Sequence, residues 1–252
     1  MAKLDALAKK KDEEAKEFKP RSKSYMIFLV IFMGFVGNMD NWLSLVETRI
    51  TSEILVYYNN MPREVFALWQ AIFGIISFSV FFIAWFFDAF GRKKGILLLM
   101  AFLGIPCLFI GLFPQNFWFF MMMYGILIMA TQSNAWQIPI TEESSPKRRG
   151  LYGGLTFLIG LIPLYALLGG PISSAIGWQW AYGIMFIFFI ILLIPLYFMK
   201  ETERWEVSRE KDHGGSFLKI KDAIKSLTRK DIIYVVISSI VYTLWTISFK
   251  MG

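Results

Sequence analysis

The sequence contains one cysteine and one histidine in 252 residues, and this scarcity excludes several kinds of functional site. Cys107 lies inside an apolar run, so the sequence offers no disulfide framework and no cluster of thiolate ligands for a metal. His213 lies in a charged stretch beside two glycines. A Ser/His/Asp triad would have to use this residue, because it is the one histidine in the sequence. We therefore expect no zinc site, no Cys/His nucleophile pair and no cofactor, and the chain is predicted not to be an enzyme.

Charged residues are also scarce, and the composition is that of a chain surrounded by lipid. Charged residues make up 18% of the chain, hydrophobic residues make up 56%, and the mean hydropathy is +0.52. A water-soluble fold cannot cover that much apolar surface. Seven apolar blocks are long enough to cross a bilayer as helices, at residues 25–48, 65–87, 95–113, 117–140, 151–173, 178–199 and 232–249. The sequence therefore predicts an all-α, polytopic integral membrane protein that crosses the lipid bilayer several times.

Lysine and arginine are distributed unevenly between alternate connections of these blocks. Of the 26 basic residues, all but Arg49, Arg63 and Lys250 lie in residues 1–24, 92–94, 147–149 and 200–230. Positively charged connections stay on the cytoplasmic side, so the N-terminus is predicted to be cytoplasmic. The net charge of +7 is then mostly a consequence of topology, and we expect no nucleic-acid partner.

Changes in composition divide the chain into four parts. Residues 1–24 are predicted to be a cytoplasmic tail, 25–199 a six-helix transmembrane bundle, 200–231 a cytoplasmic linker, and 232–252 the first helix of an incomplete second bundle. The linker contains an apolar repeat typical of a short amphipathic helix, formed by Phe217, Ile220, Ile224 and Leu227. That helix is expected either to lie along the inner membrane face or the bundle, or to be a surface helix without a partner.

Four short motifs occur in order between residues 80 and 205. They are F-D-A-F-G-R-K-K-G at 87–95, Pro139 followed by E-S-S-P-K-R-R-G at 143–150, G-W-Q-W at 177–180, and E-T-E-R-W at 201–205. Together they resemble four motifs of the major facilitator superfamily, in sugar-porter-like or metabolite-proton-symporter-like members. These motifs are the G-x-L-A-D-R-x-G-R-K loop, the P…E-x-x-P…R-G element, the G-W-R-W and the P-E-S-P-R-W. The sequence departs from these patterns at Ala84, Ala89, Gln179, Lys200 and Glu203.

The resemblance implies a fold of two six-helix bundles that hold a substrate between them and rock to alternate its access. The chain then corresponds to the N-terminal bundle plus the start of the seventh helix. Its expected partners are a missing C-terminal half or a second copy of the chain. The glycine-rich block at 151–173 suits close packing and bending during such a motion.

A set of charges is predicted to meet at the cytoplasmic end of the bundle. Asp88 ends one helix and Arg92 begins the next, so their side chains are able to pair across a tight turn at Gly91. The resemblance gives these residues the role of a gate that latches the two halves together. The predicted gate consists of Asp88, Gly91, Arg92, Glu143, Arg149, Glu201 and Arg204. The alternative is that these charges only set topology and snorkel to the membrane surface.

The first apolar block is the one with carboxylates well inside it. An ionised carboxylate at the centre of a bilayer costs roughly 2.5 to 3.5 kcal/mol on insertion scales, so Asp40 is a functional candidate. Gly37, Asp40, Ser44 and Glu47 share one helical face, which is expected to line a cavity. A carboxylate that is neutral when buried and charged when wetted carries a proton. Asp40 and Glu47 are thus predicted to couple transport to protons, the alternative being a cap or an ion pair near the outer surface, for example with Arg49.

Polar amides in other apolar blocks outline a candidate binding cavity. In the fourth block, Gly125, Met129, Gln132, Trp136 and Glu143 are expected on one helical stripe. The predicted substrate-binding residues are Asn41, Gln70, Gln132, Asn134, Trp136 and Gln137. Such residues suit an uncharged polar solute, although hydrogen bonding between helices is the alternative for each of them. The interior of the first six blocks has no Lys or Arg to hold a multiply anionic solute.

The sequence therefore predicts a secondary active transporter that moves a small polar organic solute, sugar-like or another metabolite, with protons as the coupling ion. We expect it in the plasma membrane. A nontransporting sensor or scaffold on the same fold is an alternative. A seven-helix receptor is a third, opposed by the cytoplasmic N-terminus and by the absence of a buried lysine for a retinal Schiff base in the last helix.

Overall fold

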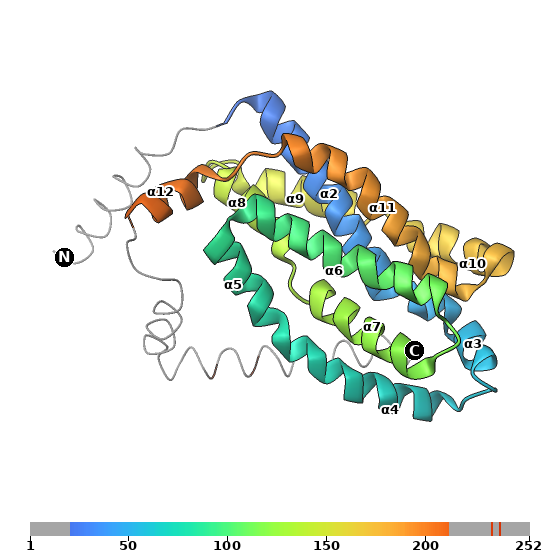
Figure 1. Cartoon of the computed structure of the whole chain (residues 1–252). Coiled ribbons are helices and arrows are strands. Elements are labelled where there is room, and N and C mark those ends of the chain that lie inside the picture. Colours follow the sequence, from blue (N-terminus) through green and yellow to red (C-terminus); the bar gives the residue numbers. More distant parts are fainter. Residues whose placement is uncertain (1–20, 212–232, 234–236, 238–252) are drawn as a thin grey trace. The chain divides into compact units, whose positions relative to one another are not determined.

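The computed structural model describes residues 21–211, 233 and 237, and within them the chain contains helices and no β-strand. Figure 1 shows the helices α2 (Lys23–Leu45), α3 (Glu47–Tyr57), α4 (Arg63–Gly74), α5 (Val80–Phe90), α6 (Arg92–Leu112), α7 (Phe117–Thr131), α8 (Ile138–Glu143), α9 (Arg149–Gly160), α10 (Leu164–Ile176), α11 (Trp178–Phe198) and α12 (Glu203–Lys211). Two 3₁₀ helices, η1 (Ile75–Ser79) and η2 (Ala135–Gln137), join α4 to α5 and α7 to α8. The expected linker helix, the tail up to residue 20 and nearly all of the seventh block lie outside the described residues.

Five helical stretches are long and apolar enough to cross a membrane. They are Lys23–Leu45, Arg63–Phe90, Arg92–Leu112, Arg149–Ile176 and Trp178–Phe198, which match the first, second, third, fifth and sixth apolar blocks of the sequence. The fourth block, residues 117–140, is not one helix. It consists of α7, a turn, η2 and the start of α8.

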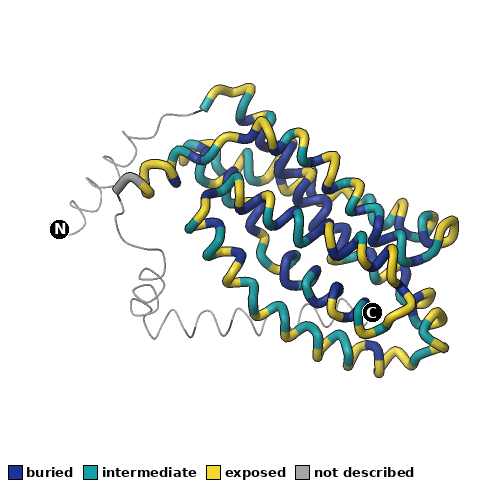
Figure 2. The backbone as a smooth tube through the Cα atoms, in the orientation of Figure 1, coloured by how far each residue is buried: buried dark blue, intermediate teal, exposed yellow. Residues whose placement is uncertain are grey.

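The first membrane helix, α2, lies at the centre of the packing. In an apolar 18-residue part of α2, 72% of the residues are buried. The corresponding share is 11% in Arg63–Phe90 and 17% in Arg149–Ile176. Helix α2 packs on α9 and α11, and α11 packs closely on α6. Figure 2 shows buried stretches along α2 and α6 and many exposed residues along α4 and α5. In lipid, a helix with polar and ionisable side chains is expected to be enclosed by other helices, and α2, which carries Asn38, Asp40 and Asn41, is enclosed in this way.

Four of the expected membrane helices are interrupted. Helix α2 gives way to α3 at Val46, and α4 continues through η1 into α5. Between α7 and α8 the backbone of Asn134 turns left-handed, with φ of 46°. Between α9 and α10 the chain passes through Pro163, which has no N–H to continue a helix. Irregular backbone at membrane depth needs partners for its polar groups, so these interruptions mark where polar side chains are needed.

Candidate functional site

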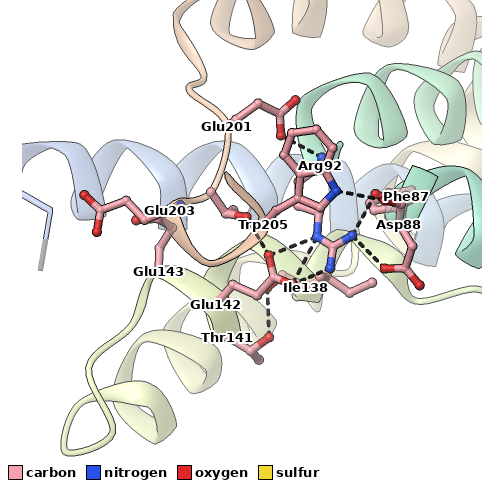
Figure 3. Close-up of polar contacts among 11 residues, drawn as sticks. Phe87, Asp88, Arg92, Ile138, Thr141, Glu142, Glu143, Glu201, Glu203 and Trp205 are labelled. Carbon is pink, nitrogen blue, oxygen red and sulfur yellow. Dashed lines mark hydrogen bonds and ion pairs between the residues drawn. The ribbon is translucent and has the colours of Figure 1, made fainter. Parts of the chain in front are cut away.

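Arg92, the first residue of α6, connects three helix ends at one end of the bundle. Its Nε lies 3.0 Å from each carboxylate oxygen of Glu142, and its Nη2 lies 2.6 Å from Glu142 Oε1. Its Nη1 donates to Asp88 Oδ1 at 2.8 Å and to the Phe87 carbonyl at 2.7 Å. Figure 3 shows the guanidinium between the end of α5 and the end of α8. The expected pairing of Asp88 with Arg92 is present, and Glu142 is a second acidic partner that the motifs did not indicate.

Glu201, just after α11, closes the start of α6. Its Oε2 accepts from the Arg92 N–H at 2.7 Å and its Oε1 from the Lys93 N–H at 3.0 Å. These N–H groups belong to the first turn of α6 and have no partner inside the helix, so the carboxylate satisfies both and favours the positive end of the helix dipole. Gly91 makes this approach possible. Its φ is +101°, and a Cβ there would lie 2.7 Å from Glu201 Oε1.

The segment after α11 contributes two further contacts to the same place. Thr202 Oγ1 donates to Glu142 Oε2 at 2.6 Å, and Trp205 Nε1 donates to the Asp88 carbonyl at 2.9 Å. We name Asp88, Arg92, Glu142, Glu201 and Thr202 the Arg92 cluster. Charge-assisted hydrogen bonds of this kind are about twice as strong as neutral ones. The cluster therefore fixes the ends of α5, α8 and α11 around the start of α6.

Glu143 is a neighbour of Glu142 but faces another partner. It is 2% exposed, and Arg21, just before α2, donates from Nε to Glu143 Oε2 at 3.1 Å. The Glu203 N–H donates to Glu143 Oε1 at 2.8 Å, and Arg21 Nη2 donates to the Glu201 carbonyl at 3.0 Å. Burial raises the pKa of Glu143 above its ordinary value, although the Glu203 N–H and Arg21 act in the opposite direction. The N-terminal end of α2 is thereby tied to the residues that follow α8 and α11.

Two of the predicted gate residues differ from the others in their surroundings. Arg204 is exposed on α12. Arg149, at the start of α9, forms no ion pair in the described part of the chain, and its Nε is buried without a hydrogen-bond partner there. The contacts described above involve five of the predicted gate residues, namely Asp88, Gly91, Arg92, Glu143 and Glu201.

Asp40 is buried within α2, with 5% of its surface exposed. Its Oδ2 accepts from Trp136 Nε1 at 2.9 Å, and its Oδ1 has no hydrogen-bond partner within the described residues. No Lys or Arg in that part of the chain pairs with it, and the alternative partner Arg49 is exposed on α3. The carboxylate is therefore held by a single neutral donor.

Gly37 makes room for that donor. A Cβ at Gly37 would lie 2.9 Å from Trp136 Cη2 and 3.0 Å from Cζ2 and Cζ3. The indole thus rests directly on the backbone of α2, three residues before Asp40, which is one turn of the helix away. The sequence predicts that the face with Gly37 and Asp40 lines a cavity, and in the structure these two residues contact Trp136, which is 2% exposed.

The two asparagines of α2 hold the break between α9 and α10. Asn41 Nδ2 donates to the Gly160 carbonyl at 3.0 Å and to the Gly37 carbonyl at 2.9 Å. Asn38 Nδ2 donates to the Ile162 carbonyl at 2.8 Å and weakly to the Gly160 carbonyl at 3.4 Å. Carbonyls at a helix end lack partners within the helix, and these amides supply them. Asn41 therefore has a structural role here alongside its predicted role in substrate binding.

Glu47, the first residue of α3, lies in a polar group that is separate from the contact between Asp40 and Trp136. Its two carboxylate oxygens accept from Gln70 Nε2 and from the Tyr124 hydroxyl, and Gln70 Nε2 also lies 3.1 Å from the Tyr124 oxygen. Gln70 comes from α4 and Tyr124 from α7, so the group joins three helices. Ser44, predicted on the same face, is exposed. No cluster of three or more His, Cys, Asp or Glu side chains suited to a metal occurs among the described residues.

The remaining predicted cavity residues lie at the break in the fourth block. Gln132, Asn134 and Gln137 are exposed, and their side chains form no hydrogen bond to the described part of the chain. The expected single stripe from Gln132 to Trp136 is wrong, because the left-handed turn at Asn134 changes the direction of the side chains. Trp136 points at Asp40, whereas the amides on either side of it are exposed in the described part of the chain.

Comparison with known protein families gives one match. The model of the Major Facilitator Superfamily matches residues 26–251, which is nearly the whole chain. A search of the curated proteins finds no match. The family match covers the described helices that carry Asp40, Glu47 and the Arg92 cluster. The chain belongs to the Major Facilitator Superfamily and is a multi-pass membrane transporter.

Proposed function

We propose that the protein is a secondary active transporter that moves a small polar organic solute by alternating access, with a proton as the coupling ion. The observation that supports this best is the environment of Asp40. The carboxylate is buried, it faces one indole N–H, and it has no cationic partner in the described part of the chain.

A carboxylate in this position has two ways to avoid the cost of an unpaired charge. It binds a proton, or the site opens to water. A conformational cycle that alternates these two conditions takes up a proton on one side of the membrane and releases it on the other. Glu47 differs from Asp40, because Gln70 and Tyr124 already donate to both of its oxygens. We assign the principal coupling role to Asp40 and a secondary role to Glu47.

The proposed solute is neutral and polar. Gln132, Asn134 and Gln137 present exposed amides near Trp136 that have no hydrogen-bond partner within the described residues, and amides recognise hydroxyl and carbonyl groups. The interior of the six apolar blocks supplies no basic residue for a multiply anionic solute. A sugar or a comparable hydroxylated metabolite fits this chemistry, with Asn41 and Gln70 completing the predicted set.

The surfaces of the second and fifth membrane helices support a two-bundle assembly. Both are largely exposed, with large apolar side chains such as Phe78 and Leu158 at the surface. Gly150, Gly153 and Gly154 of α9 have open space where a Cβ would lie, so another helix can approach their backbone. We propose that a second six-helix bundle or a second copy covers these helices, that the N-terminus is cytoplasmic, and that the Arg92 cluster acts at the cytoplasmic gate.

Transport by purified protein in liposomes tests the proposal. A thermal-shift screen of sugars, organic acids and amino acids first selects the solute, because a ligand that binds the folded state raises its melting temperature. The radiolabelled solute, with D-glucose as the first probe, is then supplied with and without an inward proton gradient. We expect gradient-driven uptake that Asp40→Asn abolishes and Glu53→Gln, an exposed carboxylate change on α3, leaves intact.

Three results would oppose this proposal in different ways. Uptake by Asp40→Asn that still follows the gradient would remove Asp40 from the coupling mechanism. Solute binding without any uptake would instead favour a sensor or scaffold on the transporter fold. Labelling of residue 5 from outside intact cells would reverse the proposed orientation.

A further inference from the structure

The short segment from Ala135 to Glu143 is bounded by two changes of backbone direction. It consists of η2 and α8, which follow one another without a gap. Before it, Asn134 is left-handed with φ of 46°, and after it, Ser144 is extended with ψ of 136°. At about 1.5 to 2.0 Å of rise per residue, the segment is roughly 15 Å long. A helical piece of that length does not bend easily, so motion concentrates at its two ends.

This segment contacts both the buried carboxylate of α2 and the Arg92 cluster. Near its start, Trp136 Nε1 donates to Asp40 at 2.9 Å. At its end, Glu142 accepts the Arg92 guanidinium through three N···O contacts of 2.6 to 3.0 Å, and Glu143 accepts Arg21 at 3.1 Å. The buried carboxylate of α2 and the Arg92 cluster are thus attached to opposite ends of one helical piece.

The segment is also packed tightly enough to move as a unit. Trp136, Pro139, Ile140 and Glu143 are all buried, and the Trp136 indole rests on the backbone at Gly37. Packed interiors switch between discrete arrangements rather than deforming gradually. A displacement of the indole at one end is therefore passed to Glu142 at the other.

We propose that residues 135–143 act as a lever that couples the Asp40 site to the Arg92 cluster, with Trp136 as the positioning residue. When Asp40 no longer holds the indole N–H, the segment turns about Asn134 and Ser144 and withdraws Glu142 from Arg92. When Asp40 holds the indole, Glu142 stays in place and the cluster is closed. The physiological meaning rests on the proposed function, because it makes Asp40 the proton-binding group. The linkage itself is testable without a substrate or a gradient.

Spin labels on either side of the Arg92 cluster measure whether the contact between Trp136 and Asp40 controls the distance between α8 and α6. Thr141 on α8 and Lys94 on α6 are both exposed, so cysteines there are accessible for labelling once Cys107, the native cysteine, is replaced by serine. The distance between labels at Thr141→Cys and Lys94→Cys is measured in the full chain in lipid nanodiscs. With Trp136→Phe added, which removes the N–H donor, we expect a longer and broader distance distribution than in the labelled parent.

A matched control separates the lever from a general loss of packing. Trp42 is another buried indole, on α2, and its Nε1 donates to the Ala181 carbonyl at 2.8 Å, so this bond does not involve residues 135–143. Trp42→Phe removes an equivalent hydrogen bond and is expected to leave the label distance unchanged. Asp40→Ala provides a second route to the same effect, because it removes the acceptor of the Trp136 hydrogen bond. It is expected to lengthen the distance as Trp136→Phe does.

The double variant Asp40→Ala with Trp136→Phe is expected to give no more change than Trp136→Phe alone, since both act on one bond. An unchanged distance in either Trp136→Phe or Asp40→Ala would overturn the lever. An equal change in Trp42→Phe would overturn it too, because the effect would then come from packing. A failure of the transport experiment with an intact label response would remove the proposed function and leave the lever standing.

Discussion

Glu142 is bound to Arg92 by both of its carboxylate oxygens, and its neighbour Glu143 points to Arg21 instead. Successive residues of a helix project about 100° apart, so two adjacent acids on α8 serve two different basic residues. The result is that α8 is tied both to the turn between α5 and α6 and to the segment that enters α2. The acidic residue of the sequence motif, Glu143, is the one that does not contact Arg92.

The first prediction concerns Glu142. Glu142→Gln removes the charge but keeps the size, so Arg92 loses its bidentate partner while Asp88 remains. We expect a loss of about 1 to 3 kcal/mol in the free energy of unfolding, the range for a charged hydrogen bond that is mostly shielded from water. Thermal denaturation in detergent measures it. Glu206→Gln, an exposed change on α12, is the control and is expected to have little effect. Equal melting temperatures for the Glu142 variant and the parent would contradict the assignment.

The second prediction concerns the turn at Gly91. Gly91→Ala places a Cβ at φ of +101°, and this atom would lie 2.7 Å from Glu201 Oε1. A backbone with φ of 101° and ψ of 164° is essentially restricted to glycine and costs about 1 to 3 kcal/mol for a residue with a Cβ, and displacement of Glu201 adds to that. A lower melting temperature is expected.

Gly150→Ala is the matched control for this change. Gly150 lies in the first turn of α9, and a Cβ added there would meet no other atom within 4 Å. Alanine at this position is therefore expected to be neutral or to raise stability by up to about 1 kcal/mol. If both alanine variants melted alike, the special role of the Gly91 turn would be refuted.

The third prediction concerns Arg21 and pH. Burial raises the pKa of Glu143 in the folded chain, so folding favours its neutral form, and the stability from this group is highest at low pH and declines as pH rises through the folded-state pKa. Arg21 limits that decline by pairing with the ionised form. Arg21→Gln is therefore expected to lower the melting temperature more at about pH 7.5 than at about pH 5, measured against the parent at each pH. Lys23→Gln, an exposed basic change two residues away, controls for net charge. A deficit that is the same at both pH values would show that Arg21 does not act through Glu143.

Much of the helical architecture is predictable from the sequence, because apolar blocks of about 20 residues have one stable conformation in lipid. The pairing of Asp88 with Arg92 is also predictable, since the two charges are only four residues apart at the junction of two helices. The cost of an exposed carboxylate in hydrocarbon leads to the prediction that the face with Gly37 and Asp40 lines a cavity, whereas in the structure these two residues contact the Trp136 indole.

The partners that come from distant parts of the chain are not predictable in this way. Arg21 belongs by composition to a charged tail, and only the fold brings it to Glu143, which lies 122 residues away. The fourth block is apolar enough to suggest a continuous helix, and nothing in its periodicity reveals the left-handed Asn134. An asparagine tolerates that conformation better than most residues, which is the one local signal for the break.

The last prediction tests whether position 37 needs glycine because a side chain there would collide with the indole of Trp136. Gly37→Ala introduces a Cβ 2.9 Å from Trp136 Cη2, and overpacking of this kind costs about 1 to 3 kcal/mol. Phenylalanine lacks Cη2, Cζ2 and Cζ3 of the indole, the three atoms that the new methyl group would meet. The double variant Gly37→Ala with Trp136→Phe is therefore expected to be more stable than the sum of the two single changes predicts.

The four melting temperatures of this cycle decide the matter. A favourable coupling between the two changes places the methyl group against the indole, as the geometry requires. Strict additivity would mean that the new methyl group and the indole do not meet, and the support that Gly37 gives to Trp136, and through it to Asp40, would be refuted. Trp42→Phe in place of Trp136→Phe completes the control, because Trp42 donates to the Ala181 carbonyl and is not among the nearest neighbours of a Cβ at Gly37. Its combination with Gly37→Ala is expected to be additive, so that coupling appears only where the two side chains share the same space.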